Sequence, residues 1–145
     1  MSLGAKKLLV VTIFLSLSCI TSCERRTNLS IKDELSPSFE VTGGGYELFF
    51  SIGEVGPDRD QFGRKEELPI WVFKSKQRSA HETWPRIVYG QLVDEFKQSF
   101  PDQGNPAPLI EGKLYGVHAT IYGTSGDSLW FVVKNGKAVE TSKPE

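Results

Sequence analysis

The chain has few of the groups on which disulfides, metal sites and nucleophilic catalysis depend. Its two cysteines are Cys19 and Cys23, so no thiol follows position 23 and no disulfide can stabilise the rest of the chain. Its two histidines, His81 and His118, are far apart in the sequence, and no zinc ligand set is visible around either one. The strand-to-helix serine motif of hydrolases is also missing. We therefore expect no cofactor and no enzymatic activity, with His81 a solvated loop residue.

The sequence also lacks the surplus of basic residues that nucleic-acid binding requires. It contains 17 basic and 18 acidic side chains, for a net charge of −1. Residues 1–22 hold Lys6 and Lys7 but no acid, so the remaining chain has 15 basic against 18 acidic residues and a net charge of −3. Proteins that bind DNA or RNA normally show a basic face. We therefore expect no nucleic-acid partner.

The hydrophobic run near the start of the chain is too short to span a membrane. Lys6 and Lys7 precede an apolar segment from Leu8 to Leu17 that only Thr12 and Ser16 interrupt. A transmembrane helix needs about 20 apolar residues. A charged flank followed by a short apolar core is instead the layout of an export signal.

The segment Ile20-Thr21-Ser22-Cys23 resembles the lipobox of bacterial lipoproteins, in which an apolar residue and two small residues precede the cysteine. The resemblance implies that residues 1–22 are a signal peptide, that the Cys23 thiol carries a diacylglyceryl group and that its new amine is acylated. Each buried methylene contributes about 0.8 kcal/mol, so several acyl chains hold a protein at the membrane permanently. The membrane is then a partner through the N-terminal lipid.

Other interpretations of this region stay open. Cys19 is a second candidate for the lipid, although Ser16 rather than an aliphatic residue lies three positions before it. Secretion with cleavage after Ser18 would leave Cys19 and Cys23 free to pair, but that disulfide would close only a very short loop. By the lipoprotein resemblance, Glu24 in place of the aspartate that retains lipoproteins at the inner membrane favours the outer membrane, if the host has one.

Composition divides the rest of the chain into three parts. Residues 23–38 are polar without periodicity, and we expect a flexible tether, a few residues of which could dock as an edge strand. Residues 39–140 are expected to form one domain, and 141–145 a disordered tail. Glycine and proline between β-branched and aromatic runs are typical of an all-β domain. The expected strands are Phe39–Val41, Tyr46–Ile52, Leu68–Lys74, Arg86–Tyr89, Leu114–Tyr122 and Ser128–Val133.

Three local patterns refine the all-β prediction. Gly43-Gly44-Gly45 is expected to form the first turn. Leu68–Lys74 is apolar on both faces, which predicts a central strand. The apolar spacing in Gln91–Phe100 fits a helical stripe, so we expect at most one short helix, near 91–100.

The last two expected strands predict a hairpin, its register and a candidate binding face. If residues 123–127 close the hairpin, one face carries only apolar pairs, which are Ile121 with Leu129, Ala119 with Phe131, and Val117 with Val133. The other face carries His118, Tyr122 and Trp130. An exposed tryptophan beside another aromatic ring is a common recognition surface. The alternative is that these rings lie under the loop at 102–108 or under the tether.

The spacing of Leu109, Gly112 and Tyr115 resembles the tyrosine corner of fibronectin type III and other immunoglobulin-like domains. In those domains the tyrosine ring enters the core and its hydroxyl bonds to the backbone. The resemblance implies an antiparallel immunoglobulin-like β-sandwich in which Trp71 is a core residue. Glu111 replaces the proline that often precedes the glycine.

A weak candidate for a metal site is the group Asp58, Asp60 and Gly63, which occupy the first, third and sixth places of a calcium loop. Phe62 and Pro69 stand at the fifth and twelfth places, where oxygen ligands are required. We therefore expect an exposed charged loop here and no metal.

These patterns predict a lipid-anchored, extracytoplasmic β-sandwich that acts as a non-catalytic binding or accessory module of the bacterial envelope, with an envelope protein as partner. The alternative is a binder of small ligands or carbohydrate that uses the aromatic face. An enzyme is the third hypothesis. Its acids would be scattered carboxylates such as Asp94, Glu95 and Asp127, which would have to converge in one pocket.

Replacing Cys23 by serine tests the anchor. Serine has no thiol to form the thioether with lipid, so we expect the Cys23→Ser protein to keep its signal peptide and to lose labelling by fatty acid. Gel mobility and intact mass measure both effects, and Cys19→Ser is the matched control. A Cys23→Ser product that fractionates with lipid at the mobility of the wild type would refute the anchor.

Overall fold

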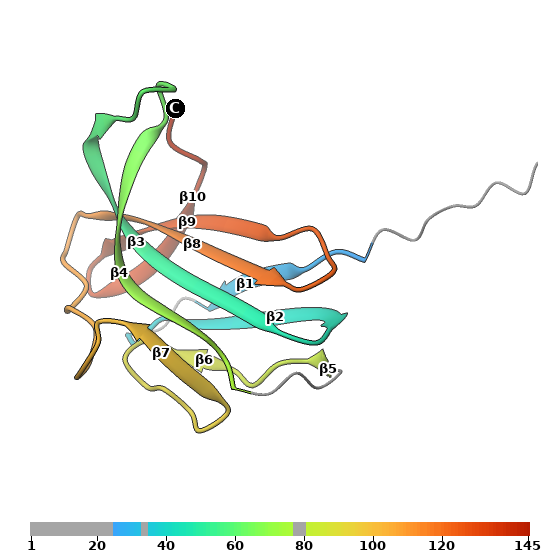
Figure 1. The fold of residues 1–145 in the computed structure, drawn as a ribbon. Helices are drawn as coiled ribbons and strands as arrows, with labels where there is room; N and C mark the ends of the chain where they lie inside the picture. The colour runs from blue at the N-terminus through green and yellow to red at the C-terminus, as the bar shows by residue number, and fades with distance from the viewer. Residues whose placement is uncertain (1–24, 33–34, 77–80) are drawn as a thin grey trace, which may run out of the picture.

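The computed structural model describes residues 25–32, 35–76 and 81–145. Within these ranges the chain forms ten strands and no helix, in two antiparallel sheets that pack as a sandwich (Figure 1). This confirms the prediction of an all-β antiparallel sandwich. The described part of the chain accordingly offers no helix long and apolar enough to cross a membrane. The predicted signal peptide, Cys19 and the lipid site Cys23 lie outside the described residues.

The larger sheet has six strands in the order β10–β9–β8–β3–β4–β7. In the smaller sheet β2 lies between β1 and β5, and β6 also pairs with β2. Every pairing between named strands is antiparallel. The strands are β1 (Asn28–Lys32), β2 (Ser38–Gly45), β3 (Leu48–Arg59), β4 (Lys65–Ser75), β5 (His81–Thr83), β6 (Ile87–Val88), β7 (Phe96–Phe100), β8 (Leu114–Ile121), β9 (Asp127–Lys134) and β10 (Lys137–Thr141).

Strand β3 forms the middle of the larger sheet because it pairs with both β4 and β8. Its residues Leu48, Phe50 and Ile52 are buried, as the period of two predicts. Tyr46, the first residue of the expected strand Tyr46–Ile52, precedes β3 and is 53% exposed. Strand β4, expected to be central, pairs with β3 and β7.

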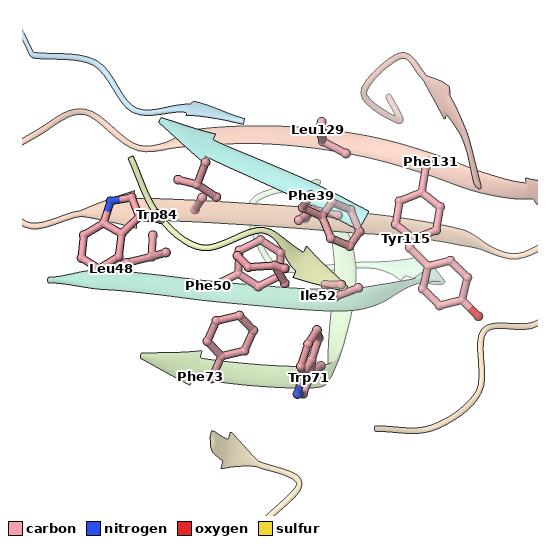
Figure 2. Packing of buried hydrophobic residues seen from close by; sticks show 14 of the residues in the cluster. Phe39, Leu48, Phe50, Ile52, Trp71, Phe73, Trp84, Tyr115, Leu129 and Phe131 are labelled. Atoms are coloured by element: carbon pink, nitrogen blue, oxygen red, sulfur yellow. The ribbon is translucent and has the colours of Figure 1, made fainter. Parts of the chain in front are cut away.

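An aromatic cluster joins the two sheets (Figure 2). The ring of Phe39, on β2, lies 5.5 Å from Phe50 and 6.0 Å from Phe131 of the larger sheet, between ring centroids. Phe50 in turn stacks on Phe73 at 4.9 Å. Trp71 is fully buried, as expected, and its indole N–H donates to Gln98 Oε1 at 2.8 Å. Truncating a buried phenylalanine of this kind to alanine costs about 3–5 kcal/mol, so this contact fixes how the sheets face each other.

The expected turn at Gly43-Gly44-Gly45 is wrong, because these residues form the end of β2. There the strand passes very close to β8: a Cβ atom on Gly45 would lie 2.0 Å from Ile121 Cγ2. Glycine is therefore required for close packing between the sheets. The chain passes to the other sheet one step later, at Tyr46 and Glu47.

The expected helix near 91–100 is also wrong. Phe96–Phe100 forms β7 and pairs along β4. In the predicted apolar stripe only Phe96 is fully buried, whereas Leu92 is 40% and Phe100 45% exposed. The ring centroids of Phe96 and Phe73 lie 4.8 Å apart. The open hydrogen-bonding edge of β4 outweighs the local periodicity, because strand pairing satisfies that edge and a helix would not.

Ordered strands extend beyond both ends of the expected domain. Within the 23–38 segment, Asn28–Lys32 forms the edge strand β1, which is the docking that the sequence left open. Before β1, the backbone of Arg26 forms an isolated parallel β-bridge with Ser125, and the Thr27 amide donates to the Ser125 carbonyl at 3.0 Å. The 141–145 segment, expected to be a disordered tail, begins in β10 and ends with the Glu145 carbonyl accepting from Arg59 Nη2 at 2.9 Å.

The register of the β8–β9 hairpin differs from the prediction by four residues. Val117 pairs with Leu129, whereas its predicted partner was Val133. Phe131 pairs with Tyr115, whereas its predicted partner was Ala119. In the observed register the N-terminal segment docks on the start of β9, where the Leu29 amide donates to Asp127 Oδ2. A shift by an even number preserves the faces, so the residues predicted for the core are still buried.

Tyr115 adopts the geometry that its resemblance to a tyrosine corner implies. Its ring is buried and stacks on Phe131 at 5.3 Å, and its hydroxyl accepts a hydrogen bond from the Ile110 amide at 2.9 Å. The contact fixes the loop before β8 to the strand itself.

The Tyr115→Phe variant measures this contact. The ring would still fill the core, but the Ile110 amide would lose its acceptor, so we expect a loss of about 1 kcal/mol in the free energy of unfolding. Urea denaturation with an unchanged m-value would report it. Tyr46→Phe is the control and should have no effect, and an equally stable Tyr115→Phe protein would contradict the contact.

Candidate functional site

The long β3–β4 hairpin and the C-terminal residues enclose a cleft on the outer face of the larger sheet. Figure 1 shows the hairpin rising past the rest of the sheet, with the C-terminus beside its tip. The cleft has a volume of about 740 Å³. Its lining includes Glu67 from β4, His118 from β8, Ser128 and Trp130 from β9, and Lys143 from the tail.

The carboxylate of Glu67 connects the hairpin to the sheet. Its Oε2 lies 2.5 Å from His118 Nε2, and its Oε1 accepts from Trp130 Nε1 at 3.2 Å. Because a carboxylate at neutral pH only accepts, Nε2 of His118 is assigned the proton. Gly116, opposite Trp130, makes room for this carboxylate: a Cβ atom there would lie 2.6 Å from Glu67 Oε2.

His118 and Trp130 reach the cleft because of strand alternation. His118 lies between buried Val117 and Ala119, and Trp130 between buried Leu129 and Phe131, so both point away from the core. Their rings meet edge to face with centroids 6.0 Å apart. His118 also pairs directly with Ser128, whose Oγ lies 2.7 Å from Nδ1.

The hydrogen-bonded chain Ser128–His118–Glu67 contains the residue types of a serine hydrolase triad. Such a serine also needs backbone donors for the oxyanion, commonly its own amide. The Ser128 amide already donates to Asp127 Oδ1 at 2.8 Å, and it belongs to a regular strand. These three hydrogen-bonded side chains therefore form the floor of the cleft, and the Ser128 amide is not available as an oxyanion donor.

Two opposing effects set the charge of Glu67. Burial raises the pKa of this carboxyl, but hydrogen bonds from His118 and Trp130, together with the charges of His118 and Lys143, outweigh burial and lower the pKa below its ordinary value. Glu67 is therefore a fixed negative charge in the cleft at neutral pH. Lys143 Nζ lies over the Trp130 ring, 5.8 Å from its centroid.

The structure brings together two of the three residues predicted for the binding face. His118 and Trp130 line the cleft, whereas Tyr122 lies beyond the end of β8, is 61% exposed and does not line it. Lys143 of the tail lies over the Trp130 ring, and the lining of the cleft, among the described residues, includes none of the 102–108 loop or of residues 25–32.

Asp60, one of the weak candidates for a metal site, has a structural role at the hairpin tip. Asp60 Oδ1 accepts from the amides of Phe62 and Arg64, both at 2.9 Å, so its carboxylate organises the hairpin tip beside Asp58. In the described ranges no group of three or more histidine, cysteine or acidic residues could hold a metal ion. His81 begins β5 and is not in a loop.

The carboxylates proposed for an enzyme do not converge. Asp94 and Glu95 precede β7 at one edge of the larger sheet, while Asp127 begins β9, with β8, β3 and β4 in between. Asp127 is engaged by the Leu29 amide.

Sequence reasoning missed Glu67, Ser128 and Lys143. Ser128 could have been found as the partner of His118 if the even register shift had been considered, because that shift keeps both on the outer face. Nothing near Glu67 or Lys143 in the sequence indicates that they approach Trp130.

Comparison of the chain with protein-family models, curated proteins and solved structures finds no match. The site therefore has to be interpreted from its own chemistry.

Replacing Glu67 by glutamine tests the state of its carboxyl. A pKa that is lowered in the folded state stabilises the protein at pH values above the ordinary pKa of 4.5. This stabilisation disappears as the pH falls through the folded-state pKa. Glu67→Gln does not titrate, so we expect it to lose less stability than the wild type between about pH 5 and pH 3. Urea denaturation across that range measures the difference, with Glu140→Gln as control. Parallel profiles for wild type and Glu67→Gln would contradict the lowered pKa.

Proposed function

We propose that the chain is a lipid-anchored, extracytoplasmic protein of the bacterial envelope that acts as a non-catalytic binding module, and that the cleft beside Trp130 is its binding site. The observation that carries this proposal is the convergence of Glu67, His118 and Trp130 from three strands in one hollow. An indole with an apolar face and polar groups fixed around it is typical of a site for a small ligand.

The size of the cleft supports a small ligand or one side chain of a partner protein. Binding sites for small molecules commonly have volumes of about 300–1,000 Å³, and the cleft falls in this range at about 740 Å³. Its lining is preorganised, because the Glu67 carboxylate holds both His118 and Trp130 in place. A preorganised site loses less side-chain entropy on binding.

The lipobox resemblance of Ile20 to Cys23 supports the anchor, and the Tyr115 hydrogen bond supports an immunoglobulin-like class for the sandwich. The N-terminal end of the described chain lies beside the β8–β9 turn, where Arg26 bridges Ser125. Figure 1 shows the hairpin tip and the C-terminus far from that end. A lipid at Cys23, three residues before Arg26, would leave the hairpin free to meet ligands away from the bilayer.

A fluorine-labelled protein tests the site directly. The chain has three tryptophans, so the full-length protein made with 5-fluorotryptophan and held in detergent should give three ¹⁹F resonances, of which Trp130→Phe identifies one. Small cations, anions and sugars would be titrated separately. We expect one of these classes to shift the Trp130 resonance while those of Trp71 and Trp84 stay in place.

Gly116→Ala is the matched test of the cleft, because its Cβ displaces the movable end of Glu67 without removing a charge. It should weaken binding, whereas Gly44→Ala, whose Cβ would meet nothing within 4 Å, should not. Failure of all three ligand classes to shift Trp130 would contradict the binding site. Labelling of Ser128 by a fluorophosphonate would contradict the non-catalytic role.

A further inference from the structure

The C-terminal tail places a cation inside the cleft. Lys143 follows β10 by two residues, and its Nζ lies 5.8 Å from the centroid of the Trp130 ring. A cation within about 6 Å of an indole face is attracted by the negative face of the ring. The indole N–H is donated to Glu67, so the ring is held by its edge while its face receives the ammonium group.

A fixed carboxylate completes the surroundings of this ammonium group. Glu67 lies in the same cleft, and the charge of Lys143 contributes to the lowering of its pKa. An aromatic face next to a carboxylate is the combination that recognises ammonium groups, because both attract positive charge and neither needs a hydrogen-bond donor on the protein.

The remaining charges of the cleft also favour a cation. Arg64 is neutralised within the hairpin, because its Nε and Nη2 both lie 2.9 Å from Asp60 Oδ2. Lys65 donates to the Pro57 carbonyl at 3.1 Å. With the tail displaced and Arg64 paired with Asp60, the charged lysine, arginine and acidic side chains left in the lining are Lys65 against Glu66 and Glu67.

Resting on the proposed binding function, we propose that the ligand carries an ammonium group on an aliphatic chain, and that Lys143 occupies the place of this group in the free protein. The tail then acts as an intramolecular competitor. Among the contacts that hold the tail here are those of Lys143 with Trp130 and of the Glu145 carbonyl with exposed Arg59. Exposed contacts of this kind are individually weak, so a ligand can displace the tail without unfolding the sandwich.

The experiment uses n-butylammonium, which reproduces the end of a lysine side chain, and 1-butanol as its neutral counterpart. Both are titrated into the full-length 5-fluorotryptophan protein in detergent, with the Trp130 resonance as readout. We expect butylammonium to shift this resonance and butanol to do so much more weakly. Lys143→Ala should bind butylammonium about two- to fivefold more tightly than the wild type, which is the effect of removing one cation–π competitor.

Two further variants separate charge from shape. Glu67→Gln keeps the size of the side chain but removes its charge, and should weaken butylammonium binding about tenfold without changing the weak response to butanol. Lys97→Ala, an exposed lysine on β7 at the far edge of the sheet, should behave as the wild type.

The outcomes distinguish this inference from the function on which it rests. If an anion or a sugar shifts Trp130 but butylammonium does not, even in Lys143→Ala, the ammonium ligand is refuted and the binding site stands. If Lys143→Ala binds butylammonium no more tightly than the wild type, the competing role of the tail is refuted. If no compound shifts Trp130, both proposals fail.

Discussion

The cleft depends on the two hydrogen bonds that the Glu67 carboxylate accepts from side chains on the outer face of the larger sheet. Strands β3 and β4 run well past their neighbours, and a free two-stranded ribbon is only marginally stable in water. By accepting from His118 and Trp130, Glu67 ties the base of this ribbon to β8 and β9. Gly116 leaves the space that the carboxylate needs. The hydrogen bonds that position the hairpin thus also fix the orientation of the indole that the proposed ligand would contact.

The sequence predicted the faces of the strands better than their partners. Alternation placed Phe50, Val117 and Phe131 in the core, because the period of two is a local property of the chain. The observed β8–β9 register brings Asp127 to the Leu29 amide, a contact across 98 positions that no local pattern contains. The same limit explains β7: Phe96 lies in an apolar stripe that suits a helix, and only the open edge of β4 decides for a strand.

The sequence predicted two of the side chains that form the candidate site and missed the others. His118 and Trp130 were found because outward-facing positions follow from alternation. Glu67 was missed because register shifts occur in the β3–β4 ladder between Ile52 and Gly53 and again between Val55 and Arg59. Such irregularities bend a ribbon and redirect its side chains by an amount that the sequence does not specify. Lys143 reaches Trp130 from a tail without periodicity, so its role could be recognised only in the folded chain.

A double-mutant cycle of Glu67→Ala and His118→Ala tests most directly whether the carboxylate joins the hairpin to the sheet. The free energies of unfolding of the wild type, the two single variants and the double variant would be measured in urea at pH 7. Groups that share a charge-assisted hydrogen bond are coupled, so we predict an interaction energy of about 1 kcal/mol or more. Effects of the two substitutions that simply add would contradict the proposed link and, with it, a preformed cleft.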